Sequence, residues 1–103
     1  MTAYDFDGVL FPEMRVPKPT GPFYVITSRI ACVSNLQLIQ SVVGKEAVIY
    51  MQPGEPTGDQ DKAGRWKGLI CRLGGVTKMY EDSPVHAMLI RQESPETEVE
   101  MVP

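Results

Sequence analysis

Two aspartates separated by a single residue are the most informative chemical feature of this chain. Asp5 and Asp7 lie in the segment YDFDGV, residues 4–9, where an apolar strand is expected to stop. Side chains alternate along a strand, so both carboxylates are predicted to point the same way, and Gly8 lets the backbone turn behind them. Like charges this close repel, and a divalent cation or a proton held on one carboxyl offsets the repulsion. The pair therefore predicts a functional site.

The composition is that of one small domain. The chain has 103 residues, of which 43% are hydrophobic, and its net charge of −3 does not favour broad binding to a nucleic-acid backbone. Cys32 and Cys71 lie far apart in stretches with helical patterns, so we expect two reduced, mostly buried thiols rather than a disulfide. No apolar run reaches the ~18 residues of a membrane span, and acids stand where a signal peptide would be basic and then apolar. A soluble, cytoplasmic protein is expected.

Periodicity predicts four strands and three helices. Runs of β-branched and aromatic residues predict strands at 2–6, 23–27, 47–51 and 76–80, and apolar residues at helical spacing predict helices at 29–43, around 66–73 and at 84–92. The proline-rich segment 8–22 is expected to be a loop, and residues 52–58 a turn.

Three residues mark the expected helix boundaries. Ser28 is the expected N-cap of the first helix, Gly44 its end, and Ser83 the N-cap of the last.

This order of elements predicts an α/β fold, a three-layer sandwich on a mostly parallel, Rossmann-like sheet. Residues 1–92 are expected to form the single catalytic domain. The segment 93–103 is rich in glutamate and proline, and we expect it to be an acidic, mobile tail. Parallel sheets bind ligands at the carboxyl ends of their strands, and three of these ends are polar or acidic, at residues 5–7, 27–29 and 81–83.

The same segments resemble the motifs of the haloacid dehalogenase-like (HAD) superfamily of aspartate-nucleophile phosphohydrolases. The matching pieces, in chain order, are DFDGV at 5–9, VITSR at 25–29, a lysine near 66–67 and YEDSP at 80–84. Within the superfamily the chain is most similar to small domains of RNA-repair and phage-type proteins. The resemblance implies a minimal sheet without a cap domain, because the linking segments are too short to hold one.

The resemblance also implies roles for individual residues. Asp5 would attack a phosphoryl group and form an aspartyl-phosphate, and Asp7 would protonate the leaving oxygen and then activate water. Mg²⁺ would be held by Asp5, the backbone carbonyl of Asp7 and Asp82. Thr27, Ser28 and Arg29 would bind the substrate, Thr27 through the phosphoryl oxygens. Lys67 would neutralise charge on the nucleophile and the transferring group.

Several of these assignments have simpler alternatives. Lys62 competes with Lys67 as the motif lysine, because it lies nearer the expected helix start, although Lys67 is favoured by its place after Trp66. Glu81 could be a solvated neighbour of Asp82, and His86 a surface or capping histidine rather than a substrate contact. Whether each of these lysine, glutamate and histidine side chains is buried or exposed to solvent distinguishes its functional role from the simpler alternative.

A capless site is open to solvent unless an oligomer or another partner covers it, and it suits a macromolecular phosphate better than a small metabolite. The sequence therefore predicts a Mg²⁺-dependent phosphatase acting on a phosphorylated nucleic-acid end or a nucleotide. The alternative is a non-catalytic phosphate- or metal-binding module, such as a receiver-like signalling domain. Receivers need an acceptor aspartate after the third strand, where this chain has Met51-Gln52-Pro53.

Overall fold

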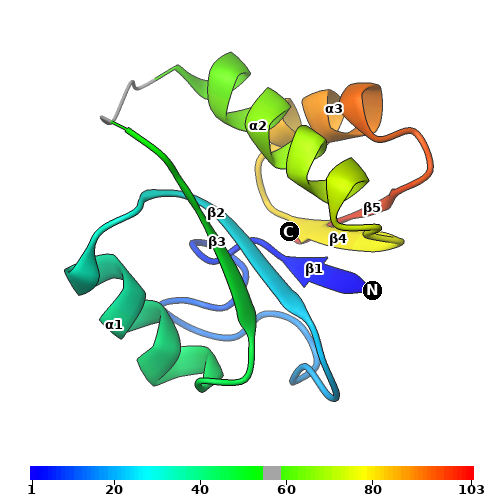
Figure 1. Cartoon of the computed structure of the whole chain (residues 1–103). Coiled ribbons are helices and arrows are strands. Elements are labelled where there is room, and N and C mark those ends of the chain that lie inside the picture. The colour runs from blue at the N-terminus through cyan, green and yellow to red at the C-terminus, as the bar shows by residue number, and fades with distance from the viewer. Residues whose placement is uncertain (55–58) are drawn as a thin grey trace.

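A five-stranded parallel sheet forms the centre of the molecule (Figure 1). The computed structural model describes residues 1–54 and 59–103, so part of the predicted turn at 52–58 lies outside the described residues. All neighbouring strands pair in parallel, in the order β3-β2-β1-β4-β5. Their bounds are Thr2–Tyr4 for β1, Tyr24–Ile30 for β2, Val48–Gln52 for β3, Lys78–Glu81 for β4 and Glu98–Met101 for β5.

Helices cover both faces of the sheet and complete the predicted three-layer α/β sandwich. Helix α1, Val33–Val43, packs on one face, and α2, Gln60–Leu73, lies beside α3, Pro84–Glu93, on the other (Figure 1). None of these helices, within residues 1–54 and 59–103, has the length and apolar composition needed to cross a membrane.

The alternation of side chains along β1 decides which way its acidic end faces. Ala3 lies in the core beneath α2 and α3, whereas Tyr4 and Phe6 lie in the second core, beside α1. Asp5, between them, faces the α2 side, where it meets Lys67. Phe6 is fully buried in the second core, on the face opposite Asp5.

The strand order places a ligand-binding position at the end of β1. From β1 the chain adds β2 and β3 on one side of the sheet and then β4 and β5 on the other, so the order reverses between β1 and β4. Open α/β sheets bind ligands in the crevice outside the strand ends at this reversal. Asp5 follows β1 and Glu81 ends β4, so acidic side chains occupy this position.

The start of the first helix differs from the prediction. Strand β2 continues to Ile30, helix α1 begins only at Val33, and the N-cap is Cys32. Ser28 therefore lies within the strand and is not a helix cap. The β-branched Ile30 and its pairing with Gln52 extend the strand, past an irregularity in register between Thr27 and Ile30.

One thiol is also placed differently from the prediction. Cys71 is buried, as expected, but Cys32 is exposed, because the cap position lies outside the apolar face of α1. Both thiols are free.

The prediction of a mobile tail from Glu93 is wrong for its central part, which forms β5 and pairs with β4 along four residues. Val99 and Val102 are buried, while Glu98 and Glu100 are exposed. The glutamates therefore form the solvent-facing side of an edge strand. Buried and exposed residues alternate along this strand, but its acidic composition made the segment resemble a solvated tail. The ordered domain extends beyond residue 92.

Two glycines let α2 and α3 approach each other closely. A Cβ atom on Gly64 would lie 3.2 Å from the Cα atom of His86, and one on Gly68 would lie 2.6 Å from the Cβ atom of Glu93. Only a residue without a side chain fits such contacts. This close packing brings the first turn of α3 within reach of Lys67.

We expect Gly68→Ala to destabilise the protein. Alanine favours a helix over glycine by about 1 kcal/mol, but overpacking against Glu93 and the Ile90 backbone costs about 1–3 kcal/mol. Urea denaturation measures the net change, and the exposed Arg72→Ala on the same helix should stay within about 0.5 kcal/mol of the wild type. A Gly68→Ala variant more stable than the wild type would contradict the close helix contact.

Candidate active site at the ends of β1 and β4

A buried lysine stands at the centre of the candidate site. Lys67 is 1% exposed, and its ammonium donates to Asp5 Oδ1 over 2.9 Å and to Glu81 Oε2 over 3.0 Å. His86 Nδ1 lies 3.0 Å from the same nitrogen. One side chain of α2 thus joins β1, β4 and α3. Of the two candidate lysines, the structure brings Lys67 to Asp5, while Lys62 is exposed.

Two buried carboxylates share this single ammonium. Burial lowers the pKa of Lys67, but the charges of Asp5 and Glu81 outweigh it and raise the pKa above its ordinary value, so the lysine stays protonated. Burial raises the pKa of Asp5 well above its usual range, and the nearby charge of Glu81 raises it further against the opposing effect of Lys67. Burial and the neighbouring Glu81 thus disfavour the charged form of Asp5, and a bound cation would favour it.

Glu81 fixes the position of Lys67 and of the turn that follows β4. Its side chain is fully buried, with Oε2 on Lys67 and Oε1 accepting from the backbone N–H groups of Asp82 and Ser83, each at 3.2 Å. Both oxygens are thus engaged. Glu81 is therefore not a solvated neighbour of Asp82, which was an alternative that the sequence left open.

The position of Asp82 depends on Gly8. A Cβ atom on Gly8 would overlap with Asp82 Oδ2, and Gly8 has a φ of +82°, a conformation that L side chains rarely adopt. The loop after β1 therefore passes directly beside the Asp82 carboxylate. Gly8 serves both the turn and the close approach.

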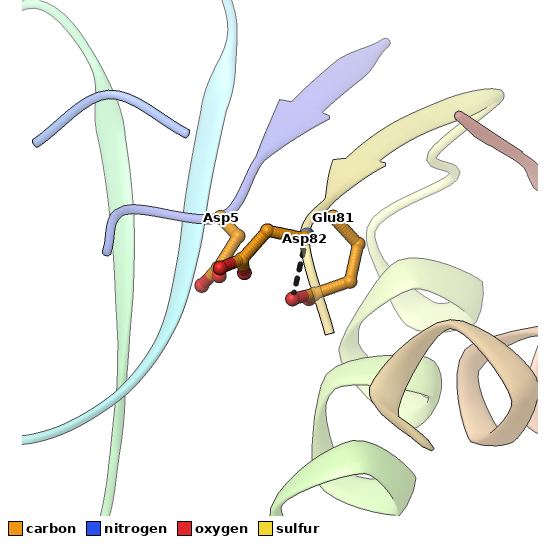
Figure 2. A group of neighbouring side chains, drawn as sticks. All are labelled: Asp5, Glu81 and Asp82. Carbon is orange, nitrogen blue, oxygen red and sulfur yellow. Dashed lines mark hydrogen bonds between the residues drawn. The ribbon is translucent and has the colours of Figure 1, made fainter. Parts of the chain in front are cut away.

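Three acidic side chains gather at the neighbouring ends of β1 and β4. Figure 2 shows Asp5 entering from the end of β1 and Glu81 and Asp82 from the end of β4, and one ligand oxygen of each lies within 4.8 Å of the others. Carboxylate oxygens suit a hard divalent cation. Because both oxygens of Glu81 are engaged, Asp5 and the exposed Asp82 are the residues best suited to hold a cation directly.

Asp7 takes part in a separate ion pair. Arg29 donates to both of its carboxylate oxygens, from Nε and Nη2, over 2.8 Å each, and Arg29 Nη1 donates to Asn35 Oδ1 over 3.0 Å. The guanidinium lies 5.5 Å from the ring centre of Phe6 and 5.8 Å from that of Phe11. Arg29, predicted to bind substrate, is thus paired with the predicted acid–base residue.

The structure places Thr27 and Ser28, both predicted to bind substrate, within β2. Thr27 is fully buried within β2, and its hydroxyl accepts a hydrogen bond from the Arg29 N–H over 3.1 Å. Ser28 is exposed in the same strand. Since α1 begins at Val33, its N-terminal amides do not directly follow Thr27 as the sequence suggested.

The inward placement of Glu81 and His86 is the part that sequence reasoning missed. Met79 and Glu81 are two residues apart on β4, so they face the same side, and Met79 is fully buried. That spacing could have shown that Glu81 points inward. The buried position of His86 follows from the contact between α2 and α3, for which the pair Gly64 and Gly68 was the available signal.

We expect Lys67→Met to destabilise the protein by about 3–5 kcal/mol at pH 7, because it leaves two buried carboxylates without their cation. Lys62→Met, a matched change on an exposed residue of the same helix, should alter the free energy of unfolding by no more than about 0.5 kcal/mol. Urea denaturation compares the two. Equal, small effects would contradict a buried ion pair at Lys67.

The chain matches no protein-family model, no curated protein and no solved structure in the three comparisons made with known proteins.

Proposed function

We propose that this protein is a Mg²⁺-dependent phosphohydrolase of the HAD type, with Asp5 as the nucleophile. The observation that carries the proposal is the contact of Lys67 with Asp5 at 2.9 Å, beside Asp82, at the reversal of strand order. A carboxylate nucleophile next to a fixed ammonium and a second free carboxylate suits phosphoryl transfer, whose catalysis consists mainly of positioning and charge stabilisation.

The reaction would proceed in two displacements. In the first, an oxygen of Asp5 bonds to phosphorus as the bond to the leaving oxygen breaks, and Asp7 gives that oxygen a proton. In the second, Asp7 takes a proton from water, the water oxygen bonds to phosphorus, and the carboxylate of Asp5 leaves with inorganic phosphate as the product. Lys67 would stabilise the negative charge on the transferring group.

A bound Mg²⁺ would supply charge neutralisation for the phosphoryl oxygens. Asp5 and Asp82 would hold it through their carboxylates, together with the backbone carbonyl of Asp7 that the family resemblance implies. Glu81 would act on the site indirectly, because its two oxygens hold Lys67 and the turn after β4. This division leaves the exposed carboxylate of Asp82 beside the nucleophile.

Asp7 must leave Arg29, at least in part, to transfer protons. Its side chain is 49% exposed and that of Arg29 is 29% exposed, so solvent reaches the pair and weakens it. An anionic substrate could draw the guanidinium away from Asp7, which keeps a substrate-binding role for Arg29 within the proposal.

The proposed substrate class is a phosphorylated nucleic-acid end or a nucleotide. The proposed location of the protein and its substrate is the cytoplasm. In the described part of the chain, the connections around the site consist of a loop, α1 and β3, with no inserted cap domain. A site of this kind accepts the end of a large molecule, and an oligomer or another partner could cover it.

The bidentate hold of Arg29 on Asp7 favours a second candidate, a phosphate- or metal-binding module without turnover. In that case the paired Asp7 would be structural, and the acidic cluster would bind a cation without a following reaction. The two candidates differ in whether a covalent phosphoryl group forms on Asp5.

We expect Asp5→Asn to lower phosphatase activity by ~10³-fold or more, because an amide cannot act as the nucleophile. The assay uses 3′- and 5′-phosphorylated oligonucleotides and nucleotides, with Mg²⁺ and with a chelator, and mass spectrometry of acid-quenched protein detects phosphoryl transfer to Asp5. Asp61→Asn, an exposed acid on α2, serves as the control. Activity that survives Asp5→Asn, or that needs no divalent cation, would overturn the mechanism.

Binding of the metal alone gives a separate prediction. Mg²⁺ should raise the melting temperature of the wild type, because a ligand that binds only the folded state stabilises it. The rise should be lost in Asp82→Asn and kept in Asp61→Asn, as measured by differential scanning fluorimetry. A rise in Asp82→Asn equal to that of the wild type would place the cation elsewhere.

A further inference from the structure

The contact between His86 and Lys67 is not used by the mechanism above. Lys67 has three ammonium protons, and three acceptors surround it: Asp5 Oδ1 at 2.9 Å, Glu81 Oε2 at 3.0 Å and His86 Nδ1 at 3.0 Å. Each proton has one partner. The long, flexible side chain of a lysine is thereby held in a single position.

We propose that His86 is a positioning residue, whose ring nitrogen Nδ1 accepts the third proton of Lys67 and keeps the ammonium directed at Asp5. The effect on turnover rests on the proposed phosphohydrolase function. The hydrogen bond itself does not.

The contact fixes the tautomer of the imidazole. A protonated lysine can only donate, so Nδ1 must be unprotonated and the ring proton must lie on Nε2. Burial, together with the charge of Lys67, lowers the pKa of His86, which agrees with a neutral ring. His86 is therefore an acceptor toward Lys67 and carries no charge.

The buried position of the His86 ring is energetically unfavourable for its other nitrogen. Nε2 is buried and has no hydrogen-bond partner among the described residues, and an unsatisfied buried donor is destabilising. An apolar side chain would avoid this cost but would leave a proton of Lys67 unpaired. The presence of a histidine at this position is explained if the site requires a hydrogen-bond acceptor at Nδ1.

A neutral acceptor also suits the charge of the site. A third carboxylate in this place would add negative charge to a cluster that already holds two buried carboxylates and one ammonium. Histidine instead satisfies the proton of Lys67 without changing the charge beside Asp5.

The backbone holds His86 in place from two directions. Its N–H donates to the Ser83 side chain over 3.2 Å, at the N-cap of α3, and Gly64 of α2 packs against its Cα atom. The first turn of α3 is thus fixed relative to α2. The ring is presented to Lys67 by both helices.

The test compares two replacements of His86. In His86→Asn, the side-chain oxygen can take the place of Nδ1 as an acceptor, whereas His86→Leu removes the acceptor. For the proposed reaction, we expect His86→Leu to lower kcat by about 10–100-fold with little change in KM, as is typical when a supporting hydrogen bond is lost. His86→Asn should restore most of the wild-type kcat. Equal kcat values for the Asn and Leu variants, measured where both are folded, would overturn the proposal.

A second measurement decides the proposal without any enzyme activity. His86 is the only histidine in the chain, so its ring-nitrogen NMR signals need no assignment among several rings. We expect an Nε2-protonated neutral ring at pH 7, an Nδ1 signal that shifts in Lys67→Met, and slowly exchanging Lys67 ammonium protons that persist in His86→Asn and vanish in His86→Leu. An Nδ1-protonated or charged ring would overturn the proposal. If no substrate is turned over but these signals appear, only the phosphohydrolase function fails.

Discussion

The buried ammonium of Lys67 at the carboxyl ends of β1 and β4 is the constraint on which the rest of the site depends. Removing a charge from water costs several kcal/mol, and the cost is recovered only if the partners are close and well aligned. Helix α2 can therefore bury Lys67 only where β1 supplies Asp5 and β4 supplies Glu81. The side chains of Lys67, Asp5 and Glu81 both anchor helix α2 to the sheet and form the centre of the candidate site.

Small residues provide the clearance that this ion pair needs. Gly64 and Gly68 let α3 lie against α2 and so bring His86 to Lys67, and Gly8 lets the loop after β1 pass beside Asp82. A buried ion cluster adds little stability compared with a well-packed apolar core. Its presence at the reversal of strand order, with glycines at the closest contacts, is what the proposed chemistry at Asp5 would require.

Much of the fold follows from local sequence patterns, and the errors have physical causes. The order of strands and helices was predictable because most elements carry their own periodicity and the three helices end at glycine or serine. Strand β5 was missed because its buried Val99 alternates with glutamates, which resemble a solvated tail in composition. Asp5 and Lys67 could be paired from motif order, but His86 could not, because its burial arises from contact between two helices and not from any local pattern.

The structure also changes the reason for expecting a cation. Sequence spacing suggested that Asp5 and Asp7 repel each other and share one ion, yet each has its own basic partner, Lys67 for Asp5 and Arg29 for Asp7. The excess of acidic groups lies instead across the sheet, where Asp5, Glu81 and Asp82 converge and the single ammonium of Lys67 pairs with the first two. A divalent cation at this point would offset the excess, and the pairing of strands β1 and β4, rather than the spacing of two aspartates, creates the place for it.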